Sequence, residues 1–205
     1  MRFLILLLST PYILSACILF LLKRGEVYND YIICKKFISK NMVLTSSVPN
    51  ILFYKLILAE DHRNNYHYGV DPIAIVRCLI KKIFMGELQG GSTIEQQLVR
   101  TITRKYKISI YRKIREQLIS VMINFHFKDK VLFGKIYLAI AYYGHNRFGL
   151  ESLPSIEREN SSEVIARLKY PTRKNQKPSE NMKIKVRTKY IDGLFSISYK
   201  RFTTD

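Results

Sequence analysis

The sequence predicts a mainly α-helical domain that follows an N-terminal transmembrane helix. An uncharged apolar run opens the chain, apolar residues recur at helical spacing through its middle, and no series of alternating strand patterns is present. The 205 residues are 47% hydrophobic and 24% charged, which is typical of a folded protein and excludes a disordered one. This length is enough for one domain with a core and for an anchor.

The opening run, residues 3–22, contains no charged side chain. Twenty such residues form a helix roughly 30 Å long, which matches the hydrocarbon core of a bilayer. Arg2 precedes the run and Lys23 follows it. We therefore expect an uncleaved membrane anchor over residues 1–24. A cleaved signal is the alternative, because residues 14–17 resemble a lipoprotein processing site, although the apolar run continues beyond them.

Charge does not settle the orientation of this anchor. More Lys and Arg residues follow the apolar run than precede it, and the positive-inside rule then favours a cytoplasmic side for the rest of the chain. Residues 25–46 are polar and mixed, so we expect a connector there and assign the domain to residues 47–205.

Apolar spacing predicts the helices in the first part of the domain. Residues 51–61 carry apolar side chains at helical intervals, and residues 73–84 form a helix that is both apolar and basic. Gly90 and Gly91 then break the chain, and residues 92–103 restart a helix.

Two further helices are predicted in the second part. Residues 110–127 form the longest amphipathic stretch, and residues 131–143 form a strongly apolar one. Residues 173–187 are basic and lie near Pro171 and Pro178, which predicts a segment rich in loops.

The charge balance restricts the kind of partner. The chain has 34 Lys and Arg against 16 Asp and Glu, a formal charge of +18, which indicates a nucleic acid, an acidic phospholipid or a phosphorylated substrate. The basic residues are scattered among apolar helices and no DNA- or RNA-binding motif is present, so we expect no nucleic acid. The three cysteines, Cys17, Cys34 and Cys78, fit neither a disulfide framework nor a zinc pattern.

A first candidate site segment lies at the end of the helix over residues 51–61. Glu60 and Asp61 end this apolar helix, and His67 and Gly69 follow at short range. A carboxylate at a helix end that faces a cleft can act as a general base or acid. A solvated acidic helix end is the equally simple structural alternative.

The second segment, residues 90–100, is a flexible turn followed by a helix start. Ser92 or Thr93 can cap this helix, and Ser92 with Glu95 has the spacing of a capping box. Free N–H groups and the positive end of the helix dipole favour an anion there. An ordinary capped helix is the alternative.

Two pairs of polar residues lie four positions apart and so share a helix face. These are Gln96 with Arg100 and Arg112 with Glu116. An exposed salt bridge between Arg112 and Glu116 would contribute only a few tenths of a kcal/mol. Alternatively, Arg112 and Lys113 hold phosphate oxygens and Glu116 supplies a second carboxylate.

Taken together, these segments resemble the peptidoglycan glycosyltransferases, which are the transglycosylase modules of class A penicillin-binding proteins and the monofunctional transglycosylases. The order and spacing of the motifs agree over residues 48–153, about half the chain. The matching residues are Glu60, Asp61, His67 and Gly69 for EDxxFxxHxG, residues 90–100 for GGSTIxQQLxK, Arg112, Lys113 and Glu116 for RKxxE, and Tyr137, Leu138 and residues 142–144 for a fourth motif.

The resemblance implies a mainly α, lysozyme-like glycosyltransferase domain with a groove and a hydrophobic region that touches the bilayer. It also implies that the chain polymerises lipid II into glycan strands. The 4-hydroxyl of a lipid II acceptor would join the anomeric carbon of the growing glycan, with inversion and release of polyprenyl pyrophosphate.

The resemblance assigns a role to each matched residue. Glu60 would be the general base on the acceptor hydroxyl, and Glu116 a second catalytic carboxylate that orients or stabilises its neighbours. Arg112 and Lys113 would hold the donor pyrophosphate, with a divalent cation, Mg²⁺ or Mn²⁺, assisting. The other substrate-binding residues would be Asp61 and, on the acceptor side, Ser92, Thr93, Gln96, Gln97 and Arg100.

The implied partners are lipid II, the nascent glycan strand, the lipids of the cytoplasmic membrane and other proteins of cell-wall synthesis. The chain would be a single-pass protein of the bacterial cytoplasmic membrane, with its catalytic domain on the periplasmic or outer face. This side conflicts with the charge distribution around the anchor, and we expect export because lipid II is polymerised outside.

The sequence departs from the family pattern at packing and positioning residues. Asn64 replaces the Phe of the first motif, Ala139 and Lys135 replace the Asn and Glu of the fourth, and Ile108 replaces a basic residue near the third. An inactive membrane-bound relative that acts as a scaffold or regulator is therefore the alternative function. Glycan cleavage is a weaker one, because a neutral leaving group needs no cationic cradle.

Overall fold

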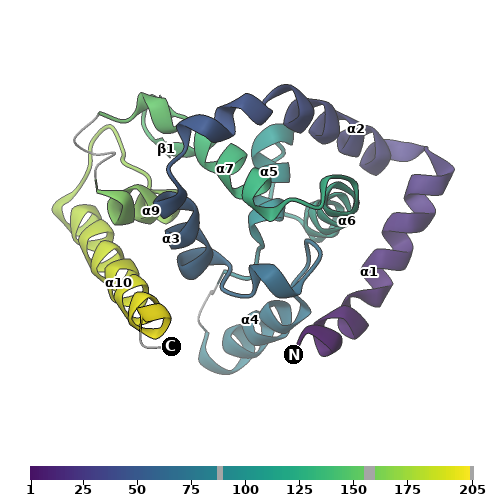
Figure 1. The fold of residues 1–205 in the computed structure, drawn as a ribbon, viewed down its shortest axis with the longest axis horizontal. Coiled ribbons are helices and arrows are strands. Elements are labelled where there is room, and N and C mark those ends of the chain that lie inside the picture. The colour runs from purple at the N-terminus through teal and green to yellow at the C-terminus, as the bar shows by residue number, and fades with distance from the viewer. Residues whose placement is uncertain (87–89, 155–159, 204–205) are drawn as a thin grey trace. The chain divides into compact units, whose positions relative to one another are not determined.

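The structure is a computed structural model that describes residues 1–86, 90–154 and 160–203, and it confirms the mainly α class (Figure 1). Its α-helices are α1 Arg2–Leu22, α2 Gly25–Lys40, α3 Asn50–Glu60, α4 Pro72–Met85, α5 Ile94–Thr103, α6 Ile110–Phe127, α7 Lys130–Ile140, α9 Ser161–Lys169 and α10 Pro178–Thr203. Short 3₁₀ turns are η1 Met42–Ser47, η2 Asn64–Tyr66 and η3 Leu150–Ser152, and strands β1 Tyr142–Gly144 and β2 Arg147–Phe148 pair antiparallel.

The chain divides into two compact units, each formed by two stretches of sequence. Unit 1 comprises Met1–Met42 and Arg63–Gly134, and unit 2 comprises Val43–His62 and Lys135–Asp205. Each unit is described by itself below. The division into an anchor over residues 1–24, a connector over residues 25–46 and a domain over residues 47–205 stays a prediction.

Unit 1 is built around α6. Helices α1, α2 and α5 pack against it, and every residue of α6 from Arg115 to Asn124 is buried. One buried carboxylate, Asp30 on α2, ties these elements together. It accepts hydrogen bonds from Arg115 at 2.5 Å and from Lys105 at 2.8 Å. Because a buried charge needs a partner, this network fixes α2 on α6.

Helix α1 is apolar around its whole circumference, with a mean hydropathy of 2.3 over its best window. It is the one helix among the described residues that is long and apolar enough to cross a membrane. One face, with Ile5, Ser9 and Ala16, is buried in unit 1, where α1 packs mainly on α6. At its start, Arg2 donates to the hydroxyl of Tyr68 at 3.3 Å.

Unit 2 joins α3, α9 and α10, which pack on one another in all three pairs. Lys55 on α3 is buried, and its ammonium donates to Ser162 on α9 at 2.6 Å and to Asp192 on α10 at 3.3 Å. Ser162 also bonds to Asp192. This polar network connects the three helices, with Lys55 and Ser162 buried and the Asp192 side chain 56% exposed.

Two segments differ from the sequence prediction. Residues 25–40, expected in a connector, form α2, which buries Asp30, Tyr31, Cys34 and Ile38. The expectation of a loop-rich segment over residues 173–187 was wrong from position 178 onward, because Pro178 is the first residue of α10. Proline is tolerated at that position since its missing N–H has no helical acceptor.

Helix α7 ends earlier than its apolar sequence predicts. It stops at Ile140, and residues 142–144 form β1 instead of a last helical turn. Gly149 follows the β1–β2 hairpin with φ +81°, and a Cβ there would lie 2.6 Å from the carbonyl oxygen of Ala139. The close packing of the hairpin on the end of α7 therefore requires glycine at this position.

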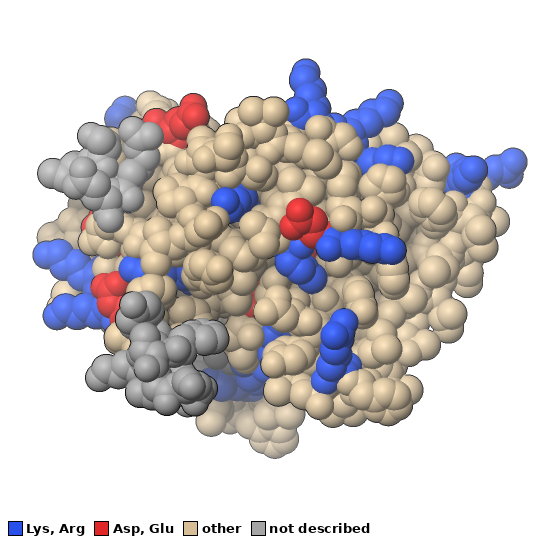
Figure 2. Space-filling model, viewed as in Figure 1, with Lys and Arg blue, Asp and Glu red and all other residues tan. Residues whose placement is uncertain are grey.

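The surface reflects the excess of positive charge. Figure 2 shows Lys and Arg side chains spread over the visible face, with acidic side chains much rarer among them. The strongest concentration of charge that bears on function is not on this open surface, however. It lies between the last turn of α5, which carries Arg100, and the first turn of α6, which carries Arg112 and Lys113, in unit 1.

Candidate active site

The turn before α5 brings the second motif close to α4. A Cβ on Gly91 would lie 2.7 Å from the sulfur of Cys78 and 3.3 Å from the carbonyl oxygen of Ala74. Thr93, not Ser92, caps α5, because its hydroxyl accepts a bond from the backbone N–H of Gln96 at 3.4 Å. The capping leaves the Ser92 hydroxyl available for another partner.

The second motif also holds the end of the first. The carbonyl oxygen of Gly69 accepts from the Thr93 hydroxyl at 2.9 Å and from the Gln96 amide at 3.0 Å. Gly69 has φ +90°, and a Cβ on it would lie 2.6 Å from the backbone of Ser120 on α6. The glycine is required here, and it joins two motifs to the core helix of unit 1.

Lys113 and the start of α5 form one half of a cationic cluster. The ammonium of Lys113 donates to the Ser92 hydroxyl and to the side-chain amide oxygen Oε1 of Gln96, both at 2.7 Å. Burial is the largest influence on this ammonium and lowers the pKa of Lys113 to about 8, against the attraction of Glu116. A lysine with such a pKa gains a proton readily when an anion binds beside it.

The other half of the cluster is built on Glu116, which is fully buried on α6. Arg100 holds both of its carboxylate oxygens, at 2.9 and 2.8 Å, and Arg112 donates to one of them at 2.7 Å. The alternative of an exposed salt bridge is therefore wrong. Glu116 instead fixes two guanidinium groups, and the Nε of Arg112 is buried without a hydrogen-bond partner.

These residues place three cations, Arg100, Arg112 and Lys113, around one carboxylate. Arg112 and Lys113 lie at the start of α6, which begins at Ile110. Cations at a helix N-terminus are unfavourable, since the helix dipole is positive there. The surplus of positive charge favours the binding of an anion, and the N–H donors of arginine match the oxygens of a phosphate group.

The first-motif carboxylate Glu60 lies in unit 2, where it is the last residue of α3. Its Oε1 atom accepts a hydrogen bond from Arg187 of α10 at 2.9 Å. Its side chain is 20% exposed, so a substrate can reach the carboxylate. Asp61 is the C-terminal cap residue of α3 and is buried.

Comparison with known proteins decides the family. A family model described as "Transglycosylase" matches residues 31–154, which is more than half of the sequence. The chain belongs to the transglycosylase family. The match contains every residue that was predicted to take part in the site.

The proteins to which this chain is similar include penicillin-binding proteins. "Penicillin-binding protein 1A" of Aquifex aeolicus is 32% identical over 134 residues, which are 65% of this chain and 18% of that protein. "Penicillin-binding protein 1B" of Haemophilus influenzae is 39% identical over 100 residues, 48% of this chain and 12% of that protein. "Penicillin-binding protein 1A" of Rickettsia conorii is 31% identical over 184 residues, which are 82% of this chain and 22% of that protein. The chain thus spans about a fifth of these relatives' length or less.

Within the transglycosylase unit 1, residues predicted for the acceptor side and residues predicted for the pyrophosphate lie together. Ser92 and Gln96 contact Lys113, and Arg100 shares Glu116 with Arg112. Thr93 serves as a helix cap. Gln97 is half-buried, next to this cluster in sequence. The roles of these side chains toward a substrate stay predictions.

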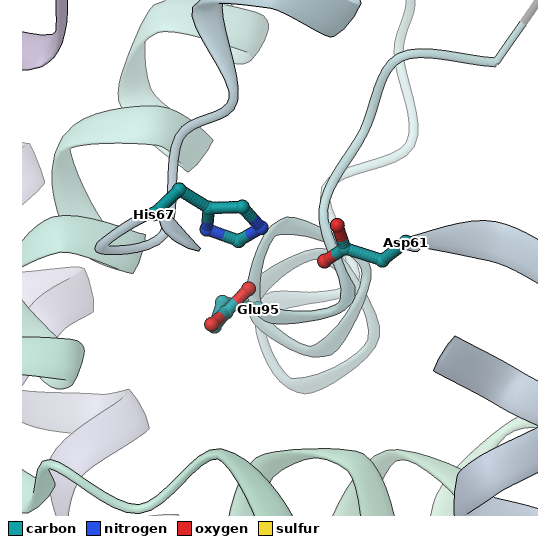
Figure 3. Close-up of side chains that lie close together, drawn as sticks. All are labelled: Asp61, His67 and Glu95. Atoms are coloured by element: carbon teal, nitrogen blue, oxygen red, sulfur yellow. The ribbon is translucent and has the colours of Figure 1, made fainter. Parts of the chain in front are cut away.

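One buried ion pair near the site was missed by the sequence reasoning. Glu95 is fully buried on α5 and accepts bonds from Lys130 and, at 2.8 Å, from Asn124. Burial alone opposes its ionisation, but the charges of Lys130 and His67 outweigh it and lower the pKa of Glu95 to about 2. Figure 3 shows the His67 ring beside the Glu95 carboxylate; Asp61, also drawn, belongs to unit 2.

The hydrogen-bond partners of two buried carboxylates in unit 1 bear on whether the expected Mg²⁺ or Mn²⁺ could bind there. The carboxylates of Glu95 and Glu116 are the natural oxygen ligands near the motifs of unit 1. Both already bond to cations, Glu95 to Lys130 and Glu116 to two arginines. A divalent ion at Glu116 would have to displace the arginines, whereas Glu95 bonds to Lys130 and Asn124 through Oε1 only and its buried Oε2 has no hydrogen-bond partner among the described residues, so the expected ion stays a prediction.

The departures from the family pattern have simple structural outcomes. Asn64, at the motif's Phe position, is buried in η2, so the position still packs inside unit 1. Ala139 is half-buried on α7, next to Leu138, whose carbonyl oxygen accepts a bond from the hydroxyl of Tyr143 at 2.7 Å. Asn64 and Ala139 therefore occupy packed positions in unit 1 and unit 2, whereas Ile108 is 89% exposed.

Proposed function

We propose that this chain is a peptidoglycan glycosyltransferase that polymerises lipid II into glycan strands. The observation that carries the proposal is the cluster of Arg100, Arg112 and Lys113 around the buried Glu116, inside the segment that matches the transglycosylase family. Such a cluster favours a substrate whose leaving group is a phosphate anion, because positive charge fixed in place stabilises the charge that develops in the transition state.

The proposed reaction is a single displacement at the anomeric carbon of the donor. The 4-hydroxyl oxygen of the acceptor sugar attacks the anomeric carbon of the donor glycan from the side opposite the leaving group. The bond between that carbon and the pyrophosphate oxygen breaks, and polyprenyl pyrophosphate departs with the electron pair. The hydroxyl proton goes to Glu60. The anomeric configuration inverts because attack and departure take place on opposite faces.

In this mechanism the cluster in unit 1 binds the pyrophosphate. Arg112 and Lys113 carry N–H donors in the first turns of α6, where the helix dipole adds to their attraction for an anion. Glu116 contributes by holding Arg100 and Arg112 in fixed orientations, so the two side chains need not reorganise as negative charge develops on the leaving pyrophosphate. We therefore assign Glu116 a positioning role.

Glycan hydrolysis is the competing enzymatic function, and the cationic cluster argues against it. A hydrolase protonates a neutral sugar leaving group with a carboxylic acid and has no use for three cations. An inactive scaffold is the remaining alternative. The presence of both Glu60 and the complete cluster favours an active enzyme, since an unused group of buried charges is costly to keep.

A membrane location supports the same substrate class, because lipid II is held in the bilayer by its polyprenyl chain. The outer face of α1 is exposed and apolar, with Phe3, Leu7, Leu14 and Leu21 among its most exposed side chains. We propose that α1 anchors the chain in the cytoplasmic membrane and that the catalytic residues lie on the periplasmic or outer face. If α1 spans the membrane, its two ends lie on opposite sides of the bilayer, and the hydrogen bond between Arg2 at its start and Tyr68 cannot form.

The test of function is polymerisation of radiolabelled lipid II by the full chain in detergent. The proposal predicts glycan strands that a muramidase digests, and release of polyprenyl pyrophosphate in equal number to the bonds formed. Arg112→Ala should lower turnover by at least about 100-fold, since loss of one preorganised transition-state donor costs that much. Cleavage of preformed glycan without polymerisation would favour the hydrolase instead.

A further inference from the structure

The proposed general base has a partner that lies outside the segment matched by the family model, which ends at residue 154. Arg187 on α10 donates from the same Nη2 atom to Oε1 of Glu60 at 2.9 Å and to the carbonyl oxygen of Ala59 at 2.8 Å. Both acceptors belong to the last turn of α3. The arginine therefore holds the end of this helix as well as the carboxylate.

The guanidinium of Arg187 is itself held in place. It lies over the ring of Tyr190, one turn further along α10, with its central carbon 5.1 Å from the ring centroid. Its side chain is only 16% exposed, and Nε is buried without a hydrogen-bond partner. A planar guanidinium that stacks on one side and bonds on the other has little rotational freedom.

This arrangement selects which oxygen of Glu60 can react. Oε1 accepts from Arg187, whereas Oε2 accepts no hydrogen bond from the part of the chain that the structure describes. The carboxylate is partly exposed, so the second oxygen can take a proton from a substrate hydroxyl. Fixing one oxygen removes the rotamers of Glu60 that would point the other away.

We infer that Arg187 is a positioning residue for Glu60 in glycosyl transfer. This inference rests on the proposed function. It predicts that Arg187 acts on the rate of the chemical step and not on substrate binding, because it reaches the substrate only through Glu60. Misplacing a catalytic group by about 1 Å can cost on the order of 100-fold in rate.

The experiment compares kcat and KM for lipid II polymerisation in three full-length variants. Arg187→Met keeps the length and most of the packing on Tyr190, and it should lower kcat by about 10- to 100-fold with KM within about twofold. Arg187→Lys, which retains a donor, should recover at least about fivefold of that loss. Lys189→Met removes an exposed cation from the same helix and should leave both constants unchanged.

A double variant separates positioning from general damage. In the Glu60→Gln background, adding Arg187→Met should cost less than about twofold, because the group that Arg187 positions is already lost. Unfolding followed by circular dichroism confirms that each variant folds.

An unchanged or raised kcat in Arg187→Met, an effect on KM alone, or an equal loss in the Glu60→Gln background would overturn the inference. A wild-type chain that forms no polymer would instead remove the proposed function, and the two failures are thus distinguishable.

Discussion

Replacing Glu116 with glutamine removes one charge from the cationic cluster and keeps the shape of the side chain. The carboxylate is 0% exposed and accepts three hydrogen bonds from Arg100 and Arg112, at 2.9, 2.8 and 2.7 Å. Breaking a buried ion pair on one side leaves the other charges uncompensated and costs about 3–5 kcal/mol. For a chain of this size, each kcal/mol lowers the Tm by roughly 2–4 °C, so we expect a decrease of about 10 °C.

The assay is thermal unfolding in detergent, followed by circular dichroism at 222 nm because the chain contains no tryptophan. Glu180→Gln is the control, since Glu180 also pairs with an arginine, Arg173, whose side chain is 74% exposed. An exposed pair contributes about 0.2–1 kcal/mol, so the control should lose no more than a few degrees. Equal, small losses in both variants would refute the electrostatic account of the cluster.

Three further predictions concern Lys113, Gly69 and the membrane side. Because burial lowers the pKa of Lys113 to about 8, the KM for lipid II should rise about tenfold between pH 7 and pH 9, and Lys113→Arg should abolish this rise. The contribution of Lys113 to folding stability should increase with pH over the same range, because the unfolded chain then binds more protons than the folded one. Gly69→Ala should destabilise the chain by at least about 2 kcal/mol in urea unfolding, and by more than Gly25→Ala, which shares a positive φ but has no atom within 4 Å of the added Cβ. A phosphatase reporter fused after Asp205 should be active in the periplasm, and activity of a cytoplasm-only reporter there would contradict export.

Most of the helices follow from apolar spacing alone. Helix α6 has the bounds that its amphipathic pattern predicts, residues 110–127, because Ser109 caps its start and its apolar positions face several neighbours. The motif residues were also predictable, since the family resemblance depends on residue identity at fixed spacing. What spacing could not show is that Glu116 is buried between two arginines from different helices.

The missed elements have sparse or polar patterns. Helix α10 has just two fully buried apolar positions among its described side chains, Ile184 and Ile191, which lie seven residues apart and give no visible stripe. Helix α2 was expected to be a connector because its residues are polar and mixed, yet one of these polar residues, Asp30, is buried by pairing with Arg115. Pairing of this kind depends on contacts distant in sequence and cannot be read from local composition.

Glu95 was missed for a related reason. Its spacing from Ser92 fits a capping box, so the sequence predicts a local role. In the structure Thr93 is the cap, and the Glu95 side chain bonds to Lys130, which lies 35 residues away. The signal that could have indicated this pair is that Glu95 shares a helix face with the apolar residues Leu98 and Val99, three and four positions later.

The most direct test of the account is lipid II polymerisation by the wild-type chain and by Glu60→Gln, measured side by side in detergent. The glutamine keeps a hydrogen-bond acceptor for Arg187 but cannot take a proton, so the variant should remain folded, with a Tm within a few degrees of the wild type. Loss of a general base lowers the rate by about 100- to 10,000-fold, and we expect a decrease of this size in the polymerisation rate of Glu60→Gln relative to the wild type. Polymerisation by Glu60→Gln at a rate near that of the wild type would contradict the mechanism.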